Sequence, residues 1–140
     1  MEYCYTNVVN IDISSEVIDA MQKKYRNFPQ LKYLKMDVRD TSAFESETFG
    51  SIIDKGTLDS LLCGNNSRKN AIKMLEEIWR VLKDKGVYVL VTYGAPLYRL
   101  RLLRKSCSWT IKLPVISLFK LLTGLLLLVD PRNCNVKSKV

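Results

Sequence analysis

Three aspartates occupy similar places in three short stretches of the sequence, each at the end of an apolar run. The stretches are VVNIDIS at residues 8–14, LKMDVRD at residues 34–40 and SIIDKGTLDSLL at residues 51–62. Each is typical of a buried β-strand with an Asp where the chain turns, here Asp12, Asp37 and Asp54. Ligands of an open α/β sheet bind just outside the carboxyl ends of its strands. The three carboxylates therefore predict a nucleotide-type pocket.

The chemistry of these acids has a functional and a local interpretation. Asp12 would close the first strand, where a carboxylate can accept hydrogen bonds from the vicinal hydroxyls of a ribose. Asp37 repeats the arrangement one strand later. The alternative for both is turn chemistry, because an Asp at a strand end often hydrogen-bonds its own backbone. Asp59 is interpreted as a surface residue of a helix.

Residue counts exclude several kinds of chemistry. The sequence has no histidine, so Ser-His-Asp catalysis, Cys-His catalysis and an H-E-x-x-H zinc site are excluded. The four cysteines are far apart and form no C-x-x-C pair, which favours free thiols in a reducing compartment over a metal or redox site. The first residues, MEYCYTN, contain no secretory signal. We therefore expect a cytoplasmic protein without a metal site.

The elements that must position the acids alternate between strand and helix patterns. Residues 8–13 and 31–36 are expected as strands, and residues 52–53 lie in a third. Ser14 or Ser15 suits the N-cap of a helix after the first strand. Alternation of this kind predicts βαβ units and a parallel sheet.

A second helix and strand are predicted further along. Apolar residues recur at helical spacing at Ala71, Met74, Leu75, Ile78 and Leu82. Lys83 and Lys85 would occupy the end of this helix, and Gly86 would stop it. Residues 87–92 form a continuous apolar run, which is typical of a parallel strand covered on both faces.

Composition indicates one globular domain with an unusual end. The chain has 140 residues, of which 47% are hydrophobic and 26% charged, enough for a real core. The net charge of +8 arises entirely from Arg99 onward, where nine basic residues accompany Asp130 alone. A basic end of this kind is usually solvated, and it can also contact an acidic partner or a membrane surface.

The last segment departs from the strand and helix pattern. Residues 111–129 are mostly apolar, but Lys112, Pro114 and Lys120 interrupt them, which disfavours a membrane-spanning helix. We predict a divergent apolar and basic tail at residues 114–140. The alternative is that part of this segment completes the core.

In their order and spacing, the three stretches resemble class I S-adenosylmethionine-dependent methyltransferases with a methyltransferase type 11-like domain. DKGTLDSLL at residues 54–62 and RVLKDKGVYVLVTYG at residues 80–94 resemble the branch of translation elongation factor lysine methyltransferases. The resemblance covers about residues 8–109. It implies S-adenosyl-L-methionine as the cofactor and a protein lysine side chain as the methyl acceptor. A nucleic acid partner is not expected, and the oligomeric state is left open.

The resemblance also implies roles for five residues. Asp12 would bind the ribose of the cofactor, with Ile13 packing beside it. Asp37 would accept a hydrogen bond from the adenine amine, with Val38 supporting the ring. Lys55 would contact the cofactor, although a solvated loop lysine is the alternative. No catalytic residue is assigned.

The fold implied by the resemblance is α/β, a partial Rossmann-like methyltransferase sheet in three αβα layers. The family places a central strand, a glycine-rich loop and a helix ahead of the strand that ends at Asp12. The sequence contains none of these, so we expect a partial domain at residues 1–113, truncated at its N-terminus, whose own activity is left open. Two other functions remain: a non-catalytic interaction module, or a peripheral membrane protein that uses the tail.

Overall fold

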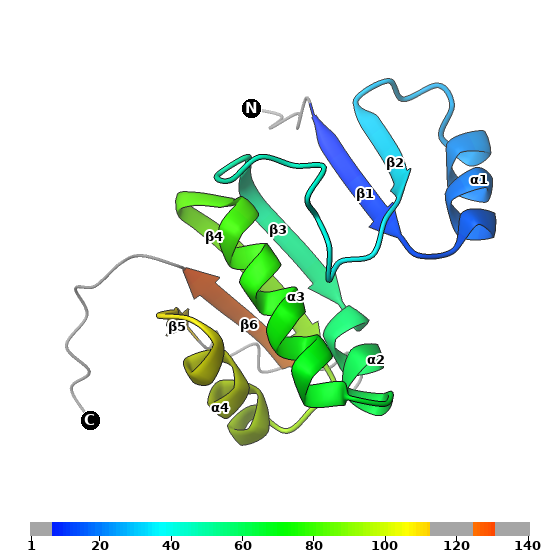
Figure 1. The fold of residues 1–140 in the computed structure, drawn as a ribbon. Helices are drawn as coiled ribbons and strands as arrows, with labels where there is room; N and C mark the ends of the chain where they lie inside the picture. Colours follow the sequence, from blue (N-terminus) through cyan, green and yellow to red (C-terminus); the bar gives the residue numbers. More distant parts are fainter. Residues whose placement is uncertain (1–6, 113–124, 131–140) are drawn as a thin grey trace. The chain divides into compact units, whose positions relative to one another are not determined.

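The computed structural model describes residues 7–112 and the strand at residues 125–130 (Figure 1). The chain divides into two compact units, Met1–Thr41 and Ser42–Val140, and each is described by itself. In chain order the elements are β1 (Val8–Asp12), α1 (Ser15–Lys24), β2 (Leu31–Lys35), β3 (Phe49–Lys55), α2 (Thr57–Cys63), α3 (Ser67–Val81), β4 (Leu82–Thr92), α4 (Pro96–Ser106), β5 (Thr110–Lys112) and β6 (Leu125–Asp130).

The first unit is a βαβ arrangement, as the sequence predicts. β1 and β2 pair in parallel, with Asp12 opposite Lys35 at their carboxyl ends. α1 connects the two strands and packs against both. The N-cap of α1 is Ser14, whose hydroxyl accepts a hydrogen bond from the N–H of Val17 at 3.2 Å. The two predicted strands and the predicted cap are confirmed.

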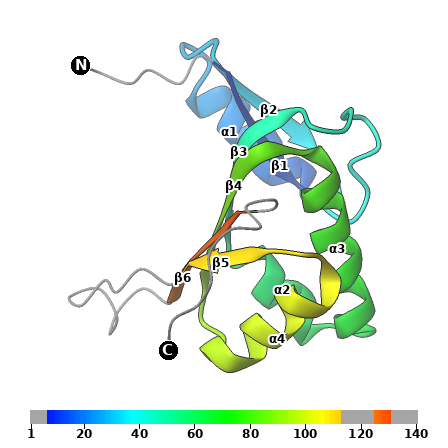
Figure 2. The same ribbon diagram turned by 90° about the vertical axis from the view of Figure 1, so that its left-hand side faces the viewer.

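The second unit contains a four-stranded sheet in the order β3-β4-β6-β5. β3 and β4 are parallel, whereas β6 is antiparallel to both β4 and β5. α2 and α3 lie side by side on one face of this sheet (Figure 2), and α4 packs against α3. The core between helices and sheet contains large side chains that are fully buried, among them Leu58, Leu75, Tyr88, Leu90 and Leu103.

β4 is covered more on one face than on the other. Tyr88 and Leu90 are fully buried beneath the helices, whereas Val87 is 37% exposed. The prediction of a strand buried on both faces is therefore wrong for the part of the unit that the structure describes. Its described helices supply one layer on the sheet, and side chains at alternate positions of a strand point to opposite faces.

α3 ends earlier than the apolar spacing predicts. It stops at Val81, and Leu82 is already the first residue of β4, paired with Phe49. The register of the two strands shifts after this pair, so the chain loops out before pairing resumes. Gly86 lies in this irregularity, where a Cβ would come within 2.8 Å of the Leu82 side chain. The glycine thus permits a close approach within the strand rather than stopping the helix.

Part of the predicted tail belongs to the sheet. Residues 125–130 form β6, which lies between β4 and β5. For these six residues the structure supports the alternative that the segment contributes to the core sheet. The boundary at residue 113 stays a prediction, and residues 113–124 and 131–140 lie outside the described residues. No helix of residues 7–112 is long and apolar enough to cross a membrane.

Candidate functional site

Asp12 and Ile13 form the end of the first strand. The Asp12 Oδ1 accepts a hydrogen bond from the backbone N–H of Ser14 at 2.8 Å, which turns the chain into α1. The other carboxylate oxygen has no hydrogen-bond partner among the described residues. The side chain of Ile13 is 65% exposed beside it. The pair therefore offers an available carboxylate oxygen next to an apolar surface.

Asp37 lies just beyond β2, at the same end of the two-stranded sheet as Asp12. Pairing continues past the strands, since the N–H of Met36 donates to the Asp12 carbonyl at 2.9 Å. The structure thus brings these two acids to one edge, as predicted from the parallel order. Val38 follows and is half-buried.

The Asp37 carboxylate is engaged by its own turn. It accepts hydrogen bonds from the backbone N–H and the guanidinium of Arg39, with Nη2 2.5 Å from Oδ2. The hydrogen bonds and the negative charge of Asp37 raise the pKa of Arg39. A ligand amine at Asp37 would have to share the carboxylate with this guanidinium.

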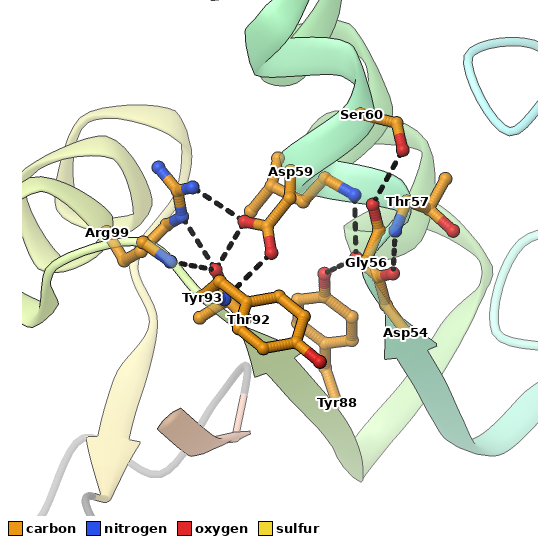
Figure 3. Close-up of polar contacts among 11 residues, drawn as sticks. Asp54, Gly56, Thr57, Asp59, Ser60, Tyr88, Thr92, Tyr93 and Arg99 are labelled. Atoms are coloured by element: carbon orange, nitrogen blue, oxygen red, sulfur yellow. Dashed lines mark hydrogen bonds and ion pairs between the residues drawn. The ribbon is translucent and has the colours of Figure 1, made fainter. Parts of the chain in front are cut away.

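Asp54, at the end of β3, is a buried structural acid. It is 5% exposed, and its oxygens accept hydrogen bonds from the N–H of Thr57 at 2.9 Å and of Leu58 at 3.2 Å (Figure 3). The hydroxyl of Tyr88 donates to the same carboxylate at 3.0 Å. Asp54 therefore anchors the first turn of α2 to β4 and does not join an open rim of three acids.

Tyr88 acts as a neutral donor to Asp54. Burial, followed by the negative charge and hydrogen bond of Asp54, holds the pKa of the Tyr88 hydroxyl well above its ordinary value. The ring also packs near Trp109, with centroids 6.0 Å apart. The contact joins the buried acid to the aromatic core of the second unit.

Lys55 and Gly56 follow Asp54 on the surface. Lys55 is exposed, and Gly56 has a φ of 83°, a backbone conformation that favours glycine. The N–H of Gly56 donates to the carbonyl of Val91 at 3.1 Å, so the turn is bonded to the end of β4. A Cβ on Gly56 would meet nothing within 4 Å, so the space beside this turn is open.

Asp59 is the centre of a second polar cluster, at the carboxyl end of β4 (Figure 3). Its carboxylate accepts hydrogen bonds from the Thr92 hydroxyl, from the N–H of Tyr93 at 2.8 Å and from Arg99 Nη2 at 2.6 Å. Arg99 Nε in turn donates to the Thr92 hydroxyl at 2.9 Å. Three elements, α2, β4 and α4, are thereby joined by one carboxylate.

The Asp59 cluster is well shielded from solvent. The side chains of Asp59 and Arg99 are 18% and 13% exposed. Burial acts to raise the pKa of Asp59, but the hydrogen bonds from Thr92, Tyr93 and Arg99 outweigh it, and the net pKa is lowered. The interpretation of Asp59 as a surface residue is wrong, and Arg99, where the basic end of the sequence begins, is largely buried in the cluster.

Sequence reasoning missed this cluster because its members are far apart along the chain. Asp59 is separated from Thr92 by 33 positions and from Arg99 by 40. The glycine at position 94 is the only nearby residue type that fits the cluster, because a Cβ at this position would collide with the Arg99 guanidinium. Within residues 7–112, no group of three or more Cys, Asp or Glu side chains could hold a metal ion.

Comparison with known sequences decides the family. The methyltransferase domain family matches residues 1–90, which is more than half of the chain. The chain belongs to this family. The matched region contains both units' predicted site residues, from Asp12 to Lys55.

Similar proteins with established names are lysine methyltransferases of eEF1A. EEF1A lysine methyltransferase 4 of Mus musculus is 32% identical over 117 residues, which cover 77% of this chain and 46% of that protein. The eEF1A lysine and N-terminal methyltransferase of Homo sapiens is 36% identical over 91 residues, covering 63% of this chain and 13% of that protein. The chain thus spans less than half the length of these relatives.

A solved structure supports the fold. A SAM-dependent methyltransferase from Methanosarcina mazei superposes with a TM-score of 0.62 at 17% identity, covering 89% of this chain and 82% of that one. The predicted class I methyltransferase resemblance, its elongation factor branch and the partial Rossmann-like α/β fold are confirmed. The chain is a methyltransferase domain of the class whose cofactor is S-adenosylmethionine.

Proposed function

We propose that this domain binds S-adenosylmethionine through Asp12, Ile13, Asp37, Val38 and Lys55, and that it serves methyl transfer to a lysine amine of a protein. The similar proteins named above are lysine methyltransferases of eEF1A, which supports a protein acceptor. The same proposal includes a cytoplasmic location, where such an acceptor and free thiols would both be found.

The observation that carries the proposal is the pair Asp12 and Ile13. An adenosine presents two adjacent hydroxyls and a flat apolar ring. Asp12 has a carboxylate oxygen without a partner among the described residues, and Ile13 beside it is largely exposed. Both stand at the carboxyl end of a parallel strand, where ligands of such sheets bind.

The other three residues contribute in different ways. Asp37 and Val38 lie at the same end of the neighbouring strand, so the carboxylate would face the adenine amine while Arg39 stays bonded to it. Lys55 is exposed in a turn whose backbone is fixed by Gly56, and its ammonium suits a carboxylate or hydroxyl of the ligand.

Methyl transfer to an amine does not depend on a strong acid or base from the protein. When bound, S-adenosylmethionine would supply a methyl group on a sulfonium. A neutral amine would attack the methyl carbon in line, S-adenosylhomocysteine would leave as the thioether, and the methylated ammonium would release a proton to solvent. The protein contributes alignment of the two reactants and exclusion of water. The absence of histidine from the sequence is compatible with that demand.

Calorimetric titration of the full chain with S-adenosylhomocysteine tests the proposal. We expect binding that weakens about tenfold or more in Asp12→Asn, because hydrogen bonds to a charged acceptor contribute about 1.5–3 kcal/mol. Asp12→Asn can keep the Ser14 contact, so the turn into α1 should survive.

Asp19→Asn is the matched control, since Asp19 is an exposed acid on α1. It should leave the affinity unchanged. Equal affinity in the wild type and Asp12→Asn would refute the ribose assignment, and an absence of binding to the wild type would refute cofactor binding by this chain.

A further inference from the structure

Tyr93 is an exposed aromatic residue on a firmly held backbone. Its side chain is 74% exposed at the end of β4. Its N–H is bonded to Asp59, and the next N–H, of Gly94, donates to the Thr92 hydroxyl at 3.1 Å. The hydroxyl of Tyr93 has no hydrogen-bond partner in the described part of the chain, and no dashed line reaches it in Figure 3.

This combination separates Tyr93 from an ordinary surface tyrosine. Five hydrogen bonds join Asp59, Thr92, Tyr93, Gly94 and Arg99. Together they hold the backbone from which the Tyr93 side chain projects. The ring itself is left to solvent, at the edge of the sheet where ligands bind. An exposed ring on a rigid backbone is suited to contact with another molecule, because the backbone loses little conformational entropy on binding.

The aromatic ring itself favours a cation over an anion. Arg99 is paired with Asp59 at 2.6 Å, so its charge is already satisfied. An aromatic face attracts an ammonium group through its quadrupole, and a tyrosine ring also packs against an aliphatic chain. A lysine side chain has both groups, an aliphatic chain of four methylenes that ends in an ammonium.

We propose that Tyr93 recognises the lysine side chain that accepts the methyl group, and that Asp59 is a positioning residue that holds Tyr93 in place. The inference rests on the proposed function and adds the residue that selects the acceptor. Tyr93 binds the lysine as its ammonium through the ring, so the hydroxyl is dispensable, and the ammonium loses a proton to solvent before the neutral amine reacts. Asp59 acts through the backbone N–H of Tyr93, the Thr92 hydroxyl and Arg99.

The test is a nuclear magnetic resonance titration of the full chain with ¹³C-labelled tyrosine rings. The probe is the peptide acetyl-Gly-Lys-Gly-amide, and its control is the same peptide with norleucine, which has no ammonium. We expect the lysine peptide to shift the Tyr93 ring signals and to bind about two- to fivefold more tightly than the norleucine peptide, which is the range of an exposed cation–π contact.

Variants separate the ring from its surroundings. Tyr93→Phe should keep the preference for the lysine peptide, whereas Tyr93→Leu should abolish it. Asp59→Asn should reduce the same preference, a ratio that a uniform loss of folded protein does not change. Tyr98→Leu is the matched control, since Tyr98 is 67% exposed and its side chain is outside the Asp59 cluster, and it should keep the preference.

The outcomes distinguish this inference from the proposed function. Equal binding of the two peptides, or a preference that survives in Tyr93→Leu or falls as far in Tyr98→Leu, would overturn the inference. Titration with S-adenosylhomocysteine is run in parallel, and Tyr93→Leu should leave that affinity unchanged. A chain that prefers the lysine peptide but does not bind S-adenosylhomocysteine would refute the proposed function, and only the recognition of a lysine side chain by Tyr93 would then stand.

Discussion

The two units place acids at the ends of parallel strands but use them differently. In the first unit, Asp12 and Asp37 bond to backbone groups two positions further along the chain. In the second, Asp54 bonds to Tyr88, 34 positions away, and Asp59 to Arg99, 40 positions away. The first pair makes turns, whereas the second pair joins elements.

The difference shows what makes a strand-end acid available to a ligand. A local turn satisfies one oxygen and leaves the rest of the carboxylate near solvent, as at Asp12. A packed helix after the strand takes the whole carboxylate into the core, as at Asp54, which accepts three hydrogen bonds. Position at the carboxyl end of a strand is therefore not sufficient for a binding role.

The largest expected effect comes from removing β6. A chain that ends at residue 124 lacks the strand between β4 and β5, so the second unit should lose its cooperative unfolding or melt about 10 °C or more lower, since each kcal/mol corresponds to about 4–8 °C. The fluorescence of Trp79 and Trp109 reports this unit alone. An unchanged midpoint with better solubility would support a separate tail instead.

Substitution of Asp54 should lower the free energy of unfolding much more than substitution of Asp12. Asp54→Asn removes the charge from a buried carboxylate and should lower the free energy of unfolding by about 2–3 kcal/mol. Asp12→Asn can keep its turn and should change it by less than about 0.5 kcal/mol. Urea unfolding followed by circular dichroism measures both. Similar losses at the two positions would remove the contrast between local and long-range acids.

A methyl group at Gly94 should break the Asp59 cluster while every polar group of the cluster is still present. The added Cβ would occupy the place of the Arg99 guanidinium, so Gly94→Ala should displace Arg99 from Asp59 and cost about 1–2 kcal/mol. Gly50→Ala is the control, because a Cβ there meets nothing within 4 Å. Thermal melts of both variants compare them, and equal midpoints would mean that the pair adds no stability.

The smallest effect concerns pH. Because the pKa of Asp59 is lowered in the folded state, its contribution to stability is complete above the unfolded value of about 3.9. It is lost as the pH falls through the folded value. Between about pH 4.5 and pH 2.5, the wild type should therefore lose more stability than Asp59→Asn. Urea midpoints across this window measure the difference, and parallel curves would contradict the pKa shift.

The sequence by itself determined the elements whose signals are local. The strand ends at Asp12 and Lys35, the Ser14 cap and the buried face of α3 all follow from neighbours within a few positions. Parallel order then placed Asp12 and Asp37 at one edge. The family could also be predicted from the order and spacing of the three short stretches, because each stretch lies close to the end of one strand.

Only the tertiary structure decided which acids are left for a ligand. Burial of Asp54 depends on Tyr88, and the role of Asp59 depends on Arg99, which α4 brings back to the end of β4. The position of β6 between β4 and β5 likewise reverses the order expected from the chain. Such pairings join positions more than thirty residues apart, and their energy comes from the packing that brings the partners together rather than from any local pattern.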